Sequence, residues 1–256
     1  MAKRIRQRVR AERATPGGRR VELKFSREGE PGIPALLLLS ESAPAPGAVL
    51  LHGYSSRKEH MAQALGGELL RHGIASLAID LPLHGSRADP LQAQSARNPL
   101  AIARHWRQAL DDAALALGYL GARKEIDSTR LALVGYSLGS FLAIAVAADE
   151  PRVHAVVLAA GGDLPTGTPL SALARAIADP IRAVRRLAGR PLLMVNGRRD
   201  PTVRPDQAER LFAAAAEPQT ISWWDAGHVL PAAATAEAAR WLAVQLQPSD
   251  TRGGAS

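Results

Sequence analysis

One serine in the sequence stands where a nucleophile could be presented to a substrate. Residues 133–144, "LVGYSLGSFLAI", place Ser137 between Gly135 and Gly139, with one apolar run before it and another after it. A serine displayed at the top of a sheet occupies a sharp strand-to-helix turn, where the two backbones approach too closely for side chains two positions away. The glycines leave room for that turn. The stretch therefore predicts a nucleophilic serine.

A serine hydroxyl needs a base to accept its proton, and histidine is the usual one. Sites of parallel sheets gather at the carboxyl ends of the strands, which favours His228 at the end of "QTISWWDAGH". His52 and His84 also follow predicted strands and stay open as alternatives. The remaining histidines fall in helices or at the opposite rim and are interpreted as structural or solvated: His60, His72, His105 and His154.

The histidine in turn needs an acid that orients its ring. Asp200, in "NGRRDPTV", follows a strand end and lies 28 residues before His228. The chain order Ser137, Asp200, His228 is that of one known class of triad. Asp163, which follows "VVLAAGG", is the alternative acid. Asp225 is disfavoured because it shares the turn of His228, only three residues away.

A tetrahedral intermediate also requires hydrogen-bond donors for its oxyanion. The backbone N–H of Leu138 opens a predicted helix, whose dipole favours negative charge. The loop after "VLLHG" is expected to supply the second donor, the backbone N–H of Tyr54.

The elements that must position these groups alternate along the chain. Continuous apolar stretches, typical of buried strands, occur at 47–53, 74–82, 130–137, 153–161, 191–200 and 219–228, with helical spacing between them. Strands buried on both sides require a parallel sheet covered on both faces. Two further strands, 20–28 and 33–41, flank the turn "GEPG" and predict an antiparallel pair. The sequence thus predicts an α/β fold with a mostly parallel twisted sheet and helices on both faces.

The length of 256 residues favours a single domain, predicted over residues 20–247. Residues 1–19 are interpreted as a basic N-terminal tail and residues 248–256 as a flexible C-terminal tail. No apolar run approaches the roughly 18 residues of a membrane-spanning helix, and the N-terminus lacks the apolar core of a secretory signal. We therefore expect no membrane span and a cytoplasmic location. The absence of cysteine excludes disulfides and thiolate catalysis.

The net charge of +8 is concentrated at the N-terminus. Residues 1–20 hold eight Lys or Arg and one acidic residue, a net of +7, which leaves the rest of the chain nearly neutral. The basic run "KRIRQRVRAER" contains no aromatic residue on which bases could stack. Nucleic-acid binding through this run is an alternative function, but we do not expect it.

With these landmarks the sequence resembles the α/β-hydrolase superfamily, and within it the small dienelactone-hydrolase-like and prolyl-oligopeptidase-like serine esterases. The resemblance covers roughly residues 47–247 and rests on "LHGYSSRKEH", "DLPLHGSR", "GYSLG", "NGRRDPTV" and "AGH" in that order. It implies ester hydrolysis without a metal or organic cofactor, by Ser137, Asp200 and His228. It also implies that His52 and Gly53 shape the oxyanion loop and that Asp80, His84 and Gly85 mark the next loop. No propeller domain is found, which argues against peptidase activity.

The leading hypothesis is a serine esterase that acts on a small-molecule ester through an acyl-enzyme. A thioesterase or acyltransferase with the same triad is the alternative within enzymes, and a non-catalytic binding protein on this scaffold is the alternative outside them. The oligomeric state is left open. Within residues 163–178, only about three helical turns, at 170–178, are available as a lid over the site, so the lid is at most small. A cover of this size can hardly bury a long acyl chain, which predicts a preference for acetate to hexanoate esters.

Overall fold

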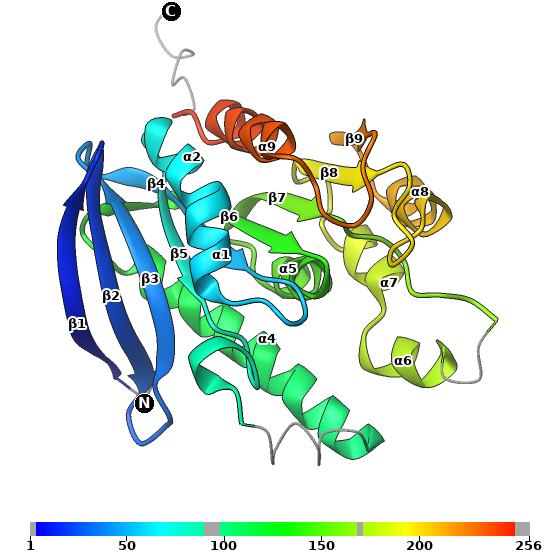
Figure 1. The fold of residues 1–256 in the computed structure, drawn as a ribbon, viewed down its shortest axis with the longest axis horizontal. Helices are drawn as coiled ribbons and strands as arrows, with labels where there is room; N and C mark the ends of the chain where they lie inside the picture. The colour runs from blue at the N-terminus through cyan, green and yellow to red at the C-terminus, as the bar shows by residue number, and fades with distance from the viewer. Residues whose placement is uncertain (1–3, 90–97, 168–170, 249–256) are drawn as a thin grey trace, which may run out of the picture.

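A computed structural model describes residues 4–89, 98–167 and 171–248. In these ranges the chain forms one nine-stranded sheet in the order β1-β2-β3-β5-β4-β6-β7-β8-β9. Strands β1 (Ile5–Thr15), β2 (Gly18–Arg27) and β3 (Ile33–Ser40) pair antiparallel with one another, and β3 pairs antiparallel with β5 (Ala75–Ile79). The antiparallel strands form one side of the molecule in Figure 1. Their pairing confirms the predicted antiparallel start of the sheet.

The remaining strands are parallel, as their continuous apolar sequences predict. They are β4 (Ala45–Leu51), β6 (Ile126–Tyr136), β7 (Val153–Ala159), β8 (Leu192–Gly197) and β9 (Gln219–Trp224). Each pairs in parallel with its neighbour, and β4 also pairs in parallel with β5. All these strands therefore point their carboxyl ends toward the same edge of the sheet, where their following loops meet.

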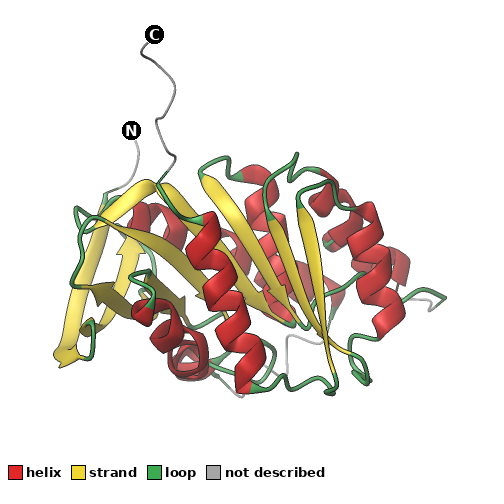
Figure 2. Cartoon of the chain, turned by 90° about the horizontal axis from the view of Figure 1, so that it is seen from above, coloured by secondary structure: helices red, strands yellow, loops and turns green. Residues whose placement is uncertain are grey.

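Helices cover both faces of the sheet (Figure 2). One core packs the sheet against α4 (Pro99–Gly121), α5 (Leu138–Asp149), α7 (Pro180–Arg185) and α8 (Pro205–Ala214). The opposite core packs it against α1 (Lys58–Met61), the π-helical segment η1 (Ala62–Gly66), α2 (Gly67–Arg71) and α9 (Ala232–Gln245). The short helices η2 (Gly85–Arg87) and α6 (Ser171–Ile177) belong to loops. The α/β fold predicted from the sequence is confirmed.

The interpretation of residues 1–19 as a tail is wrong for residues 18 and 19, which begin β2, and for residues 5–15, which form the edge strand β1. Arginine alternates with other residues along this strand, and most of its side chains are exposed. Such a strand is held by main-chain hydrogen bonds to β2 and needs no buried face, so apolar patterning does not reveal it. Most of the predicted C-terminal tail, residues 249–256, lies outside the described residues.

Candidate active site

Ser137 lies on the turn between β6 and α5, with φ 50° and ψ −113°. This positive φ is a strained conformation for a residue with a side chain, and such strain concentrates at functional sites. A methyl group on Gly139 would lie 2.1 Å from the carbonyl oxygen of Leu51, and one on Gly135 would lie 2.1 Å from the carbonyl oxygen of Gly139. Both glycines are therefore required by the close backbone contacts of the strand-to-helix turn.

The side chains of three residues predicted from the sequence form a continuous hydrogen-bonded row. His228 follows β9 and places Nε2 3.0 Å from the hydroxyl oxygen of Ser137. Its Nδ1 lies 2.8 Å from Oδ2 of Asp200, which follows β8. With the Nδ1 proton donated to the carboxylate, Nε2 is free to accept the serine proton. This arrangement can perform general-base activation of a hydroxyl.

Backbone hydrogen bonds hold the Asp200 carboxylate in place independently of the histidine. Its Oδ1 accepts hydrogen bonds from the backbone N–H groups of Thr202 at 2.8 Å and Val203 at 3.0 Å. The residue is buried, whereas the His228 side chain is 26% exposed. A buried carboxylate with both oxygens occupied presents a constant acceptor to the imidazole.

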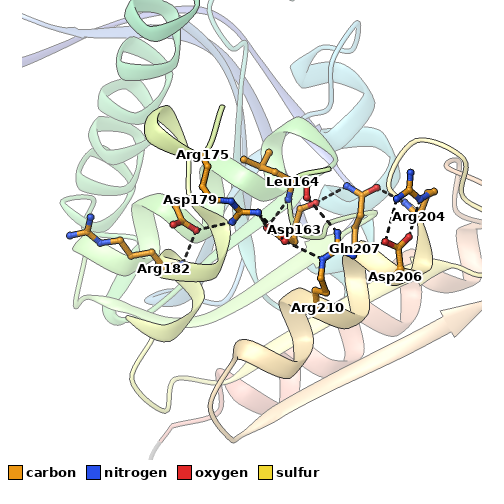
Figure 3. A network of polar contacts seen from close by, with 9 residues as sticks. All are labelled: Asp163, Leu164, Arg175, Asp179, Arg182, Arg204, Asp206, Gln207 and Arg210. Carbon is orange, nitrogen blue, oxygen red and sulfur yellow. Dashed lines mark hydrogen bonds and ion pairs between the residues drawn. The ribbon is translucent and has the colours of Figure 1, made fainter. Parts of the chain in front are cut away.

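The alternative acid, Asp163, is committed to other partners (Figure 3). Its carboxylate accepts hydrogen bonds from Arg175 at 2.9 Å and from Arg210 at 3.2 Å. Its backbone is tied to Gln207, whose side-chain amide donates to the Asp163 carbonyl oxygen at 2.7 Å. Asp163 thus joins α6 to α8. The disfavoured Asp225 is exposed and pairs with Arg199.

The alternative bases are also engaged elsewhere. The Nδ1–H of His52 donates to the Gly53 carbonyl oxygen at 2.8 Å, while its Nε2 accepts from the Leu81 backbone N–H at 3.1 Å. Both ring nitrogens of this fully buried residue are therefore occupied, and Nε2 connects the end of β4 to the end of β5. His84 bonds through Nδ1 to the Pro82 carbonyl oxygen at 2.7 Å.

Burial lowers the pKa of His52 from 6.5 to about 4, so the ring is neutral at pH 7. Between pH 6.5 and about 4, residue 52 therefore binds a proton more readily in the unfolded chain than in the folded one. We expect the free energy of unfolding to fall by about 3 kcal/mol as the pH drops from 7 to 4 on account of this residue. Urea unfolding of wild type and His52→Gln at both pH values checks this. An equal fall in both proteins would contradict it.

The loop after β5 is built around the buried carboxylate of Asp80. This group accepts hydrogen bonds from Lys58 and from Ser86, both from the backbone N–H and the side chain of each residue. Burial alone would raise the pKa of Asp80, but these bonds bring it below its ordinary value. A methyl group on Gly85, which has φ 55°, would lie 2.1 Å from the Asp80 carboxylate. These residues shape the loop beside the site.

One predicted oxyanion donor lies next to the serine, and the other lines the same cavity. Leu138 is the first residue of α5 and directly follows Ser137. A methyl group on Gly53 would lie 3.3 Å from Cβ of Ser137, so the loop that leads to Tyr54 passes against the serine. Tyr54 lines the same cavity as Ser137 and His228. That the backbone N–H groups of Tyr54 and Leu138 bind an oxyanion stays a prediction.

Sequence reasoning missed the role of Tyr136, the residue between Gly135 and Ser137. Its hydroxyl donates to the carbonyl oxygen of His228 and accepts from the backbone N–H of Leu230 at 3.1 Å. Burial raises the pKa of this phenol, which keeps it protonated. A tyrosine in a half-buried elbow must find polar partners for its hydroxyl, which is the signal that could have indicated this contact. Tyr136 holds the loop that carries His228.

We expect Tyr136→Phe to lower kcat about tenfold while leaving KM nearly unchanged, because the histidine loop loses both contacts and misaligned groups react slowly. Steady-state kinetics with one ester measures this, with Tyr119→Phe, on the far α4 helix, as the matched control. A kcat within twofold of wild type would show that the loop is held without the hydroxyl.

A cavity of about 580 Å³ opens beside the candidate triad. Ser137, Tyr136 and His228 line it, together with Tyr54 from the β4 loop. None of its described lining residues comes from α6, which instead lies near α7 (Figure 1). The helix considered as a lid, therefore, does not contribute to this cavity, although residues 168–170 lie outside the described residues. In the described ranges, no cluster of three or more acidic or histidine side chains is arranged to hold a metal ion.

The comparisons with known proteins agree with this architecture. The model of the "Alpha/beta hydrolase family" matches residues 48–190, more than half of the sequence. The chain belongs to the alpha/beta hydrolase family. Its likeness to the dienelactone-hydrolase and prolyl-oligopeptidase branches stays a prediction. No helix in the described ranges is long and apolar enough to cross a membrane.

Individual relatives are more distant. An uncharacterized protein of Mycobacterium tuberculosis, strain H37Rv, is 32% identical over 114 residues, which cover 42% of this chain and 41% of that protein. The match thus spans about two fifths of the length of this curated relative. The structure of TT1662 from Thermus thermophilus is 26% identical, with a TM-score of 0.71, and the alignment covers 84% of this chain and 94% of that one.

Two structures with lower identity share the fold. A cold-adapted esterase from an Arctic intertidal metagenomic library has a TM-score of 0.72 at 20% identity, covering 92% of this chain and 97% of that one. Acetyl xylan esterase 1 from Thermoanaerobacterium sp. has a TM-score of 0.76 at 18% identity, covering 96% and 89%. Both likenesses concern the fold alone.

Proposed function

We propose that this protein is a serine esterase that hydrolyses carboxylic esters through an acyl-enzyme. Ser137 attacks the ester carbonyl carbon while His228 accepts its hydroxyl proton, and Asp200 orients the imidazolium that forms. The backbone N–H groups of Tyr54 and Leu138 stabilise the oxyanion. His228 then returns the proton to the departing alcohol. A water molecule then attacks the acyl-enzyme while His228 accepts its proton. His228 returns that proton to the Ser137 oxygen as the acid leaves.

The observation that carries the proposal is the hydrogen-bonded row, with 3.0 Å from the serine oxygen to Nε2 of His228 and 2.8 Å from Nδ1 to Asp200. The strained backbone of Ser137 and the apolar cavity beside it support the same reading. Two proteins that share this fold, the cold-adapted esterase and acetyl xylan esterase 1, are esterases, which adds support for the reaction class.

A substrate screen tests the proposal and separates it from thioester, lactone and amide hydrolysis. Purified wild type and Ser137→Ala are compared on p-nitrophenyl esters, acyl thioesters, lactones and anilides. We expect ester turnover by wild type alone. A thioester preferred over the matched ester by tenfold or more would reassign the reaction, and no turnover of any class would favour a binding protein.

A further inference from the structure

The cavity beside Ser137 continues downward along one face of the sheet. Its deep end is lined by Val134 of β6, Val157 of β7 and Val195 of β8, all of them buried. Val134 and Val157 are direct partners across two parallel strands. The volume of about 580 Å³ falls within the range of roughly 300 to 1,000 Å³ that is typical of small-molecule sites. The site thus has a chamber below the serine as well as an opening above it.

Helices on one face of the sheet form the wall of this chamber. Ala234 and Ala238 of α9 line it on one side, and Met61 and Leu65 line it on the other. The α9 helix also packs against η1 and α2. Two alanines in this position leave the space that larger apolar side chains would fill in an ordinary core. The chamber is therefore a consequence of small side chains on α9.

The chemistry of the lining excludes a charged occupant. Lys, Arg, Asp and Glu make up 22% of the chain, yet none of them is among the described lining residues. The uncharged polar lining residues include Ser56 and His60, which bond to each other at 3.1 Å. An uncharged, apolar ligand fits such a chamber, because buried charge without a partner is costly.

We infer that this chamber binds the acyl chain of the substrate and selects a straight chain of about eight to ten carbons. The inference rests on the proposed esterase function. Val134 lies three residues before Ser137, which corresponds to about 10 Å along a strand. Carbon–carbon bonds of about 1.5 Å in a staggered chain advance about 1.3 Å per carbon, so roughly eight carbons reach this depth.

We assign the acyl group, and not the alcohol, to the chamber because of the order in which the two groups leave the enzyme. The alcohol leaves after the first step, whereas the acyl group stays attached to Ser137 until water releases it. The rim offers the departing alcohol an open path, since Tyr54 is 77% exposed and Val229 is 83% exposed. A deep chamber therefore suits the group that remains.

This inference differs from the preference for acetate to hexanoate esters predicted from the sequence. That prediction assumed that only a lid could surround a longer chain. The chamber lies between the sheet and α9, so it can surround a longer chain without a lid. Each methylene group that it buries raises the binding constant of the ester about fourfold.

Two ester series test the assignment. In the first, p-nitrophenyl esters from C2 to C16 vary the acyl chain, and we expect the largest kcat/KM at C8 to C10, at least tenfold above acetate. In the second, acetate esters of alcohols from C2 to C12 vary the other group, and we expect less than a threefold spread. A maximum at acetate in the first series, or a steep rise in the second, would overturn the inference.

Filling the chamber provides the direct control. Ala238→Phe places a ring in the chamber from its α9 wall, and we expect the ratio of kcat/KM for octanoate to that for acetate to fall at least tenfold. Val244→Phe places the same ring on the outer face of α9, where Val244 is 61% exposed, and should leave that ratio unchanged. An unchanged ratio in a folded Ala238→Phe protein would show that the chain lies elsewhere.

A binding measurement keeps the chamber testable without turnover. Titration calorimetry of Ser137→Ala with methyl octanoate and methyl butyrate should give at least tenfold tighter binding of the octanoate. Adding Ala238→Phe should remove that difference. Equal affinities for the two esters would reject the chamber as an acyl site, whereas tight octanoate binding without wild-type ester turnover would reject the proposed esterase function alone.

Discussion

Ser137→Ala lowers kcat for ester hydrolysis by roughly four to six orders of magnitude, the range found when the nucleophile of a triad is removed. The size of the loss follows from the mechanism, because without the hydroxyl no acyl-enzyme forms and only positioned water remains as a nucleophile. The fold should persist. Alanine removes a single oxygen from a partly exposed turn, and the glycine contacts that define this turn are unaffected.

Single-turnover and steady-state assays of purified protein measure this change, with Ser42→Ala in an exposed loop as the matched control. The melting temperature of each variant shows whether the loss is chemical or structural. Turnover within tenfold of wild type in Ser137→Ala would remove the serine from the mechanism, whatever the geometry of its neighbours.

The fold could be predicted because its central strands carry a strong physical signal. Strands such as 131–135 and 153–158 are apolar at nearly every position, which only a sheet covered on both faces accommodates. The edge strand β1 carries no such signal. Its alternating arginines are equally typical of a solvated tail, and only the main-chain pairing with β2 distinguishes the two.

The candidate site could be predicted in part, and the limits are physical. Their positions after predicted strands indicated Ser137, Asp200 and His228 as candidate site residues. The same criterion indicated Asp163 equally well. What separates the two carboxylates is the pair of arginines at 175 and 210, which reach Asp163 only in the folded chain. The chamber was missed because valine and alanine in a core do not indicate from the sequence whether the space between them is filled.

The two aspartates give the second large prediction. Asp200→Asn should lower kcat about 10³ to 10⁴-fold, because an amide nitrogen facing His228 favours the tautomer whose Nε2 is protonated and cannot accept the serine proton. The backbone N–H groups of Thr202 and Val203 can still donate to the remaining amide oxygen, so little stability should be lost. KM should change little, since Asp200 does not line the cavity.

Asp163→Asn is the matched control, because it makes the same change of charge and shape on a carboxylate that also follows a parallel strand. It weakens the contacts with Arg175 and Arg210, both about one third exposed, so we expect a stability loss of about 1 kcal/mol and a kcat within tenfold of wild type. Kinetics and urea unfolding of both variants separate the two effects. If Asp163→Asn proved the more damaging to kcat, the orienting acid would belong to β7 and the row through Asp200 would have another purpose.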